Sequence, residues 1–325
     1  MENQITPKIF NIYKPIGMTS GDVVHHFKKN LLRPFGKIGH FGTLDPFAEG
    51  VLLIGVGGSC RLSDYAHEFL PKTYLAKGLV GSKMTTGDRD GQLLEKKPWE
   101  HLTQKNNDEF QNIFNQFLGD YKQTPPAFSA TKHKGKALYK WARDGVIINK
   151  PPVKRKIHTI EFISLNGQEL TFRVTVSTGT YIRTLFEDLT EKLGTVGHLI
   201  VLKRESVGPI SSNDGLLKEN WPIKEVDQSN IHYYEMSELL PFQSTTLTRD
   251  QEIRYGNGIA QSLIEVEKII RPPNSLELTH YLADKPFLWV YGASNNLIGL
   301  GEIVDNTVKT CFNLPKNHYK RLKSL

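Results

Sequence analysis

The sequence predicts a body of mixed strands and helices, either α/β or α+β, followed by a small β-rich module at the C-terminus. The run VLLIGVG, residues 51–57, is continuously apolar and has the length of a strand that is buried on both faces. LTFRVTV, residues 170–176, alternates apolar and polar side chains, which is typical of a half-buried strand. FLWVYGASNNLIGLGEI, residues 287–303, indicates two strands joined by the polar turn at 294–296.

Shorter patterns predict the remaining elements of the body. Residues 9–13 and 73–80 have the character of strands, and Ser20 is a suitable N-cap for a helix over 21–32. Another helix is predicted to stop at Gly119, and its apolar stripe is interpreted as core rather than as a cofactor site. The members of that stripe are Phe110, Ile113, Phe114 and Phe117.

A helix is predicted directly after the alternating strand. Gly194 is its expected C-terminal stop, and the Gly-containing turn STGT precedes it. This order of strand, turn and helix predicts that Arg183 lies at the helix N-terminus, near the edge of the sheet. The apolar positions of the helix share one face: Ile182, Leu185, Phe186, Leu189 and Leu193.

Length and composition restrict the class of protein. The chain has 325 residues, 38% of them hydrophobic and 23% charged, as in ordinary globular proteins. It contains no apolar run of the roughly 20 residues that cross a bilayer, and the start MENQITPK does not resemble a signal peptide, so we expect a cytoplasmic protein without membrane attachment. Its two cysteines have no metal-ligand spacing, so neither a disulfide framework nor a metal site is expected.

Positive charge is concentrated in one segment. The formal net charge is +7, and residues 131–156 contain nine Lys or Arg but one acid, Asp144. Tyr139 and Trp141 are interleaved with these cations. Such a run is either a solvated surface loop with a short helix or a nucleic-acid contact, since Lys and Arg that neutralise phosphates supply affinity.

One acid stands in an unusual loop. In GHFGTLDPFAEGVLLIGVG, residues 39–57, five glycines permit sharp bends, and Pro46 fixes the dihedral angle after Asp45. A carboxylate held in this way is either a turn residue that bonds its own backbone or a reactive group.

Six segments together carry a family resemblance. GHFGTLDPFAEGVL, residues 39–52, resembles the signature of the TruB family, the bacterial tRNA pseudouridine-55 synthases. Order and spacing agree with that family over about residues 8–210. The other five segments are YKPIGMTS (13–20), KTYLAKGLVGSKMTTGDRDGQ (72–92), QTPPAFSATKHKGKALYKWARDG (123–145), STGTYIRTLFEDLTEKLG (177–194) and GHLIVLKRESVGPI (197–210).

The resemblance implies a catalytic set of three residues. Asp45 takes the position of the catalytic acid, and Arg183 is the partner expected to keep that carboxylate ionised. Tyr74 takes the position of the active-site aromatic residue, which would stack on the flipped uracil and is a candidate for handling the C5 proton. Whether Asp45 attacks the sugar, attacks the base or removes a sugar proton stays open at this point.

The resemblance also implies contacts with the substrate. Leu202 takes the position of a leucine beside the target base, and His40 that of a wedge that fills the gap left by base extrusion. Lys14 is counted with the substrate-binding residues and is expected to bond to the backbone near the site. In the basic segment, the phosphate-contact candidates are Lys132, Lys134, Lys136 and Arg143.

The implied fold is α+β, with a mixed, largely antiparallel sheet flanked by helices and Asp45 in a central cleft. We expect a catalytic domain over 1–244 with a basic thumb insertion at about 123–156. Residues 245–325 resemble a PUA-like RNA-binding domain, on the segments EIRYGNGIAQ and 287–309. The stretch 271–285 departs from a compact pattern of that kind and is expected to be an irregular loop.

The expected function is that of a tRNA pseudouridine-55 synthase, which needs no cofactor, takes the tRNA T-arm as its partner and works as a monomer without an obligate protein partner. A guide-dependent synthase of the related archaeal and eukaryotic branch is an alternative, but that branch lacks the basic thumb. A tRNA-folding chaperone without turnover would have no use for a paired acid. A glycosidase usually needs two carboxylates, and the motifs supply no second acid.

Overall fold

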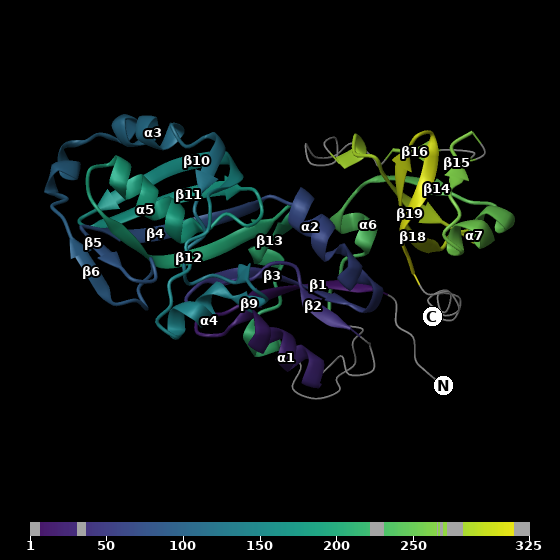
Figure 1. Ribbon diagram of the computed structural model, residues 1–325, viewed down its shortest axis with the longest axis horizontal. Coiled ribbons are helices and arrows are strands. Elements are labelled where there is room, and N and C mark those ends of the chain that lie inside the picture. Colours follow the sequence, from purple (N-terminus) through teal and green to yellow (C-terminus); the bar gives the residue numbers. More distant parts are fainter. Residues whose placement is uncertain are drawn as a thin grey trace.

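A computed structural model describes residues 7–30, 37–221, 231–264, 266, 269–271 and 282–314. They form two sheets with helices packed around them (Figure 1). Neighbouring strands of the large sheet pair antiparallel, except for the parallel pair β3–β12. The prediction of a mixed sheet is therefore confirmed. The order of its main path is β1 (Lys8–Lys14), β3 (Glu49–Val56), β12 (Gly197–Val207), β4 (Lys72–Val80), β11 (Glu169–Val176), β10 (Val153–Asn166) and β7 (Gly119–Gln123), with β2 (Ile38–His40) beside β3 and β13 (Ile210–Ser211) beside β12.

A separate β-rich sheet follows near the C-terminus, as predicted. The two strands expected around 294–296 are β17 (Phe287–Tyr291) and β18 (Leu297–Val304), and Asn295 adopts a positive φ of 56° in the turn between them. Of the stretch 271–285, residues 272–281 lie outside the described residues. The order of this sheet is β15 (Gln261–Ser262), β19 (Thr307–Asn313), β18 (Leu297–Val304), β17 (Phe287–Tyr291), β14 (Gln243–Thr246) and β16 (Ile269–Ile270).

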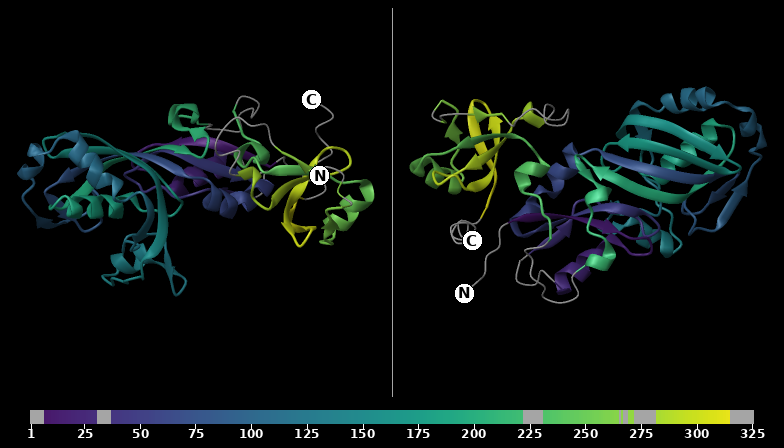
Figure 2. Two further views of the ribbon diagram at one scale, coloured as in Figure 1. Left: turned by 90° about the horizontal axis from the view of Figure 1, so that it is seen from above. Right: turned by 180° about the vertical axis from the view of Figure 1, so that it is seen from behind.

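Helices and two small hairpins complete the fold. The hairpins are β5 (Ser82–Met84) with β6 (Leu93–Lys96), and β8 (Lys132–His133) with β9 (Lys136–Ala137). The segment that contains β8, β9 and α4 (Leu138–Arg143) projects away from the large sheet (Figure 2, left). Within the described residues, no helix is long and apolar enough to cross a bilayer. The helices are α1 (Ser20–Asn30), α2 (Ser63–Phe69), α3 (Asn107–Asn115), α4 (Leu138–Arg143), α5 (Ile182–Lys192), α6 (Met236–Leu239) and α7 (Arg249–Gly256).

Helix α5 lies close against the large sheet because one sheet position lacks a side chain. A Cβ atom on Gly78 of β4 would come within 2.2 Å of the Phe186 ring. The predicted apolar face of α5 is buried, and Phe186 stacks on Phe172 of β11 with ring centroids 5.9 Å apart. The helix stops near Gly194, which has a φ of +85°. This packing fixes where the first turn of α5, and with it Arg183, meets the sheet.

The predicted start of α1 is wrong in one respect. Thr19, not Ser20, caps the helix: its hydroxyl accepts from Asp22 N at 3.0 Å, and the Asp22 carboxylate accepts from Thr19 N at 2.9 Å. Ser20 is already helical and buried. Adjacent hydroxyl residues are equivalent as caps in sequence, and the tertiary partner of Ser20, described below, decides between them.

The aromatic stripe of α3 belongs to the core, as predicted. Phe110 stacks on Phe162 of β10 with ring centroids 4.4 Å apart, and Phe114 is fully buried. The helix is shorter than predicted, since it ends at Asn115 and Gly119 instead opens β7 with a φ of +85°. Three further turn hydrogen bonds separate that glycine from the helix.

One hydrophobic cluster joins the two sheets. Val51 and Leu53 of β3 belong to the same buried cluster as Trp289 and Leu300 of the C-terminal sheet. The Trp289 indole donates to Leu240 O at 2.7 Å, which satisfies its polar atom inside the cluster. Strand β3, which follows the Asp45 loop, therefore packs against side chains of the C-terminal sheet.

Substitution of Gly50 tests the close contact at the start of β3. Gly50 has a φ of +106°, and a Cβ there would lie 2.2 Å from Arg204 O on the paired strand β12. We expect Gly50→Ala to lower the free energy of unfolding by about 3 kcal/mol or more, since strain and a backbone clash add. Gly39→Ala is the control, because nothing lies within 4 Å of its Cβ position. Equal loss in both variants, measured by urea unfolding, would contradict this account.

Candidate active site

The Asp45 loop connects β2 to β3 and is held by its backbone on both sides of the acid. The Ser20 hydroxyl accepts from Leu44 N at 2.8 Å and also contacts Leu44 O at 3.2 Å. On the other side, Pro46 O accepts from Gly17 N at 2.8 Å and from the Lys14 ammonium at 3.5 Å. These bonds fix the main chain around Asp45 and leave its side chain available.

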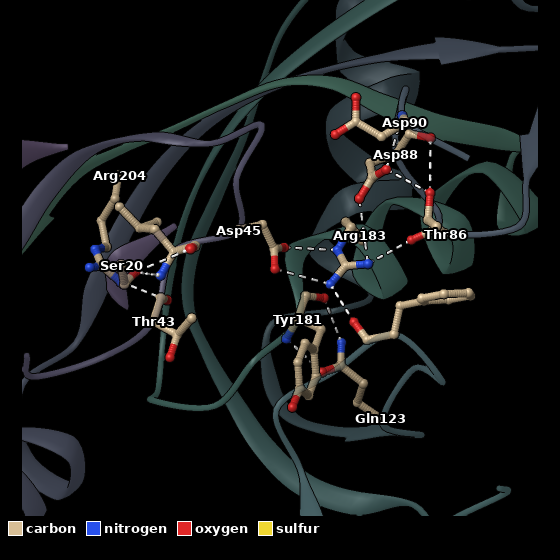
Figure 3. A network of polar contacts seen from close by, with 12 residues as sticks. Ser20, Thr43, Asp45, Thr86, Asp88, Asp90, Gln123, Tyr181, Arg183 and Arg204 are labelled. Carbon is tan, nitrogen blue, oxygen red and sulfur yellow. Dashed lines mark hydrogen bonds and ion pairs between the residues drawn. The ribbon is translucent and has the colours of Figure 1, made fainter. Parts of the chain in front are cut away.

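Arg204 of β12 also holds this loop, through main-chain carbonyls that precede Asp45. Its guanidinium donates to Val51 O at 2.7 Å, Gly42 O at 3.1 Å and Thr43 O at 3.4 Å, and the residue is 1% exposed. Figure 3 shows Arg204 and Ser20 beside the loop, on the opposite side of Asp45 from Arg183. Buried donors with several carbonyl partners fix the loop firmly.

Asp45 and Arg183 form an ion pair, as the family resemblance implied, and the structure shows that it has two contacts. Arg183 Nε lies 2.9 Å from Asp45 Oδ2, and its Nη2 donates to Oδ1 at 3.3 Å (Figure 3). The Arg183 side chain is 5% exposed, whereas that of Asp45 is 34% exposed. The carboxylate is therefore held in one orientation while part of it faces solvent, as a group that acts on a bound molecule requires.

Asp88 binds the same guanidinium and was missed by sequence reasoning. Its carboxylate lies 3.5 Å from Arg183 Nη1, which also donates to Thr86 O at 2.7 Å. Thr86 Oγ1 and Asp90 N donate to the other oxygen of Asp88. The signal that could have indicated it is the acid directly after Gly87 in the segment 72–92. A second acid does stand at the site, contrary to expectation.

Tyr74 and Leu202 lie on neighbouring strands under the site. Tyr74 is 6% exposed on β4, and Leu202 is 5% exposed on β12. In register, Tyr74 pairs with Arg204 and Leu202 pairs with Ala76. Both side chains belong to the hydrophobic cluster that includes Leu44 of the Asp45 loop. The structure thus brings the predicted aromatic and aliphatic residues to the loop that carries Asp45.

His40 is half-buried at the end of β2, five residues before Asp45. Burial, and then the nearby Arg204 charge, lower the pKa of its imidazole below the usual 6.5. Its buried Nδ1 has no hydrogen-bond partner among the described residues.

Two buried lysines surround the loop, and both titrate lower than usual. Burial lowers the pKa of Lys14 to about 8, although the Asp45 charge opposes that shift. Its ammonium donates to Met18 O at 2.7 Å and Pro15 O at 2.9 Å. Burial and then Arg204 lower the pKa of Lys72 to about 7, and its ammonium donates to the Thr178 hydroxyl. Lys72 was missed, because a lysine at a strand start predicts exposure.

The predicted phosphate contacts of the basic segment fall into two groups. Lys136 forms an ion pair with Asp144 and lies 4.5 Å from the Trp141 ring centroid, and Arg143 lies over the Tyr139 ring at 5.4 Å. Lys132 and Lys134 are exposed, and across the described residues neither forms an ion pair. The second group is the better placed for an external partner.

Metal ligation finds no support in the described part of the chain. No group of three or more His, Cys, Asp or Glu side chains there could hold an ion. Cys60 and Cys311 are both unpaired thiols.

Two solved structures share this fold over nearly the whole chain. A Cbf5–Nop10–Gar1 complex matches 97% of this chain and 87% of its own chain, with a TM-score of 0.66 and 21% identity. An H/ACA RNP bound to a substrate RNA containing 2'-deoxyuridine matches 97% of this chain and 87% of its own, with a TM-score of 0.65 and 18% identity. At these identities the likeness shows the fold alone.

Sequence comparison defines the class, that of the pseudouridylate synthases. The model of the TruB family pseudouridylate synthase N-terminal domain matches residues 28–182, which include Asp45 and Tyr74 and stop just before Arg183. The tRNA pseudouridine synthase B of Thermosipho melanesiensis is 37% identical over 264 residues, covering 80% of this chain and 82% of the relative. That of Thermotoga maritima is 41% identical over 229 residues, covering 70% and 72%. The chain belongs to the TruB family.

Substitution of Lys72 tests its burial through the pH dependence of stability. With a pKa of about 7 against the usual 10.5, the folded protein binds fewer protons here than the unfolded chain between those values. The contribution of Lys72 to the free energy of unfolding therefore rises with pH across that window. We expect Lys72→Met to make the measured slope between pH 7 and 10 less positive.

Urea unfolding at several pH values measures that slope. The matched control is Lys77→Met, a partly exposed lysine on the same strand whose ammonium pairs with Glu169 at 2.7 Å. Parallel curves for wild type and Lys72→Met would show that Lys72 is not buried as described.

Proposed function

We propose that this protein is a tRNA pseudouridine synthase that acts on the T-loop uridine, position 55. The observation that carries the proposal is the ion pair at 2.9 Å, in which Asp45 is the accessible member and Arg183 the buried one. Family membership supports the reaction class, and relatives 37–41% identical are named tRNA pseudouridine synthase B. The particular uridine comes from the resemblance of six segments to that family.

The chemistry is an isomerisation and needs no co-reactant. The C1′–N1 bond breaks, the uracil turns, and a C1′–C5 bond forms; C5 then loses its proton and N1 gains one. Asp45 supplies the carboxylate that acts at the nucleotide, as nucleophile or base. Arg183 orients it through two bonds, and Asp88 fixes Arg183 from the other edge. Substrate and product contain the same atoms at the same oxidation state, so the reaction needs no cofactor.

Access to the uridine requires base flipping, which costs a few kcal/mol. His40 is the proposed wedge, Tyr74 the stacking surface and candidate for the C5 proton, and Leu202 the side chain beside the base. Base stacking on an aromatic ring is worth about 1–3 kcal/mol and offsets part of that cost. Since the Lys14 ammonium is buried on backbone carbonyls, we assign Lys14 to support of the loop rather than to RNA.

Binding of the tRNA is proposed to involve two further parts. Residues 123–156 act as a thumb that closes on the T-arm, with Lys132 and Lys134 as its phosphate contacts. Residues 245–325 act as a PUA-like RNA-binding domain appended to a catalytic domain over 1–244. We propose a monomer in the cytoplasm, where its tRNA substrate is found.

The alternatives have less support. For a guide-dependent synthase there is likeness in fold at 18–21% identity, against 37–41% for the tRNA synthases. A chaperone without turnover leaves the Asp45–Arg183 pair unexplained. A glycosidase would use two accessible carboxylates, but Asp88 is 8% exposed and bonded on both oxygens.

The decisive test compares wild type with Asp45→Asn on a T-arm stem-loop transcript. Wild type should convert the single T-loop uridine, mapped by mass spectrometry after chemical labelling. Asp45→Asn should show less than about 0.1% of that rate with a Kd within about twofold, since Asn keeps the shape but not the charge. Asp108→Asn, which changes an exposed acid in the same way, is the control and should keep full activity. Binding without modification by wild type would leave a chaperone role.

The thumb lysines should contribute to binding and not to chemistry. Lys132→Ala and Lys134→Asn should each raise the Kd about three- to tenfold and reduce the slope of log K against log salt by about one, as loss of one phosphate contact does. Asn is chosen at 134 because that residue has a φ of 47°. Lys96→Ala, an exposed lysine on β6, is the control. A salt slope unchanged in both thumb variants would exclude these contacts.

A further inference from the structure

The basic thumb is attached to the sheet by two irregular segments. Gln123, the last residue of β7, pairs with Val153, the first residue of β10, and the chain leaves and rejoins the sheet there. The described residues 124–131 and 144–152 contain turns and bends but neither helix nor strand. Only the part between them, β8, β9 and α4, is regular, and it projects from the body (Figure 2). The regular part of the thumb is therefore joined to the sheet through two segments without helix or strand.

The incoming segment of the thumb bonds directly to the catalytic arginine. Phe128 O accepts from Arg183 Nη2 at 2.9 Å. That same nitrogen donates to Asp45 Oδ1 at 3.3 Å, so one guanidinium nitrogen bridges the acid and the thumb. Displacement of Phe128 would remove one of the two acceptors that orient Nη2 and would change the second contact of the ion pair.

The turn that leads into α5 is bonded to the same segment. The Gln123 side chain accepts from Tyr181 N at 2.7 Å and donates to Tyr181 O at 2.9 Å, and it is 1% exposed (Figure 3). The hydroxyls of Thr131 and Tyr181 lie 2.9 Å apart. Tyr181 is the N-cap residue of α5, two positions before Arg183. The backbone just before Arg183 is thus held by Gln123 and Thr131, which lie where the thumb leaves the sheet.

The thumb itself is tied to these residues. Leu138 N donates to Thr131 O at 2.7 Å, and Tyr139 N donates to Ser129 O at 3.0 Å, so α4 begins on the segment that carries Phe128. A shift of α4 is therefore transmitted to 128–131 through two main-chain bonds. The thumb is thus linked to Arg183 through the two main-chain bonds of α4, the covalent chain 128–131 and the bond of Arg183 to Phe128 O.

We infer that Phe128 O and the Thr131 hydroxyl are positioning groups that make the Asp45–Arg183 geometry depend on the position of the thumb. Engagement of RNA phosphates by the thumb then orients Arg183, so recognition of the RNA and assembly of the catalytic pair are coupled. This inference rests on the proposed function, because it needs RNA as the ligand of the thumb. A thumb that acts purely as a clamp would affect binding alone.

Removal of the Thr131–Tyr181 bond from either side tests the coupling. Thr131→Val and Tyr181→Phe each delete one hydroxyl without touching a thumb lysine. At saturating T-arm stem-loop, we expect the single-turnover rate of each to fall about tenfold while the Kd changes less than about twofold, since displaced catalytic groups lose rate rather than affinity. The double variant should be no slower than either single variant, because both remove the same bond.

Thr131→Ser is the matched control, since it keeps the hydroxyl and should restore the wild-type rate. Thermal unfolding of each variant verifies that the fold is kept. Wild-type rates at saturation in both single variants would overturn the inference, as would a double variant whose defect is the product of the two single defects.

Hydrogen exchange of the full chain supplies a readout that needs no turnover. Addition of the stem-loop to wild type should slow exchange of the amides of 181–185 together with those of 132–145. In Thr131→Val, protection of 132–145 should persist while that of 181–185 is lost. Protection of the thumb alone in wild type would overturn the coupling.

The two proposals fail in distinguishable ways. RNA binding with protection but no pseudouridine contradicts the proposed function and leaves the coupling supported by exchange. Turnover with wild-type rates in the variants contradicts the coupling alone. Absence of both RNA binding and turnover contradicts both.

Discussion

The bonding of one buried guanidinium organises the site. Arg183 is 5% exposed, and a charge removed from water in this way is costly unless all its donors find partners. Those partners are two carboxylates and two main-chain carbonyls: Asp45, Asp88, Thr86 and Phe128. They come from three parts of the chain, and Asp45 alone is 138 positions away. Sheet order and the close packing of α5 on β4 bring these segments to one point.

A second set of buried cations supports the Asp45 loop through backbone carbonyls. Arg204 bonds to Gly42 and Thr43, and Lys14 bonds to Pro46, so the main chain is held before and after the acid. In the part of the chain that the structure describes, neither cation forms an ion pair with a carboxylate. Both cations are therefore satisfied by main-chain carbonyls, which fixes the loop without a direct carboxylate partner. Burial beside the loop disfavours the charged form of Lys14 and lowers its pKa to about 8.

Local patterns predicted the elements well, and their ends and side-chain partners less well. The apolar faces of α5 and of β11 follow from residue order, since period alone determines which side chains share a face. The cap of α1 does not follow from residue order, because Thr19 and Ser20 are equal candidates in sequence. Only the tertiary structure shows that the Ser20 hydroxyl bonds to Leu44. Asp88 and Lys72 were missed for the same reason: a single acid or lysine in a motif carries no information about burial or distant partners.

The sequence by itself determined the mixed character of the sheet through its patterns and the family through the order of its motifs, and that resemblance in turn implied the pairing of Asp45 with Arg183. The thumb's role and the domain boundaries remain proposals drawn from resemblance. Only the tertiary structure decided what surrounds the pair: Asp88 at the far edge of Arg183, Arg204 and Ser20 at the loop, and Phe128 sharing Nη2 with Asp45. These contacts join residues tens to more than a hundred positions apart. Their geometry depends on strand register and helix packing, which local sequence does not encode.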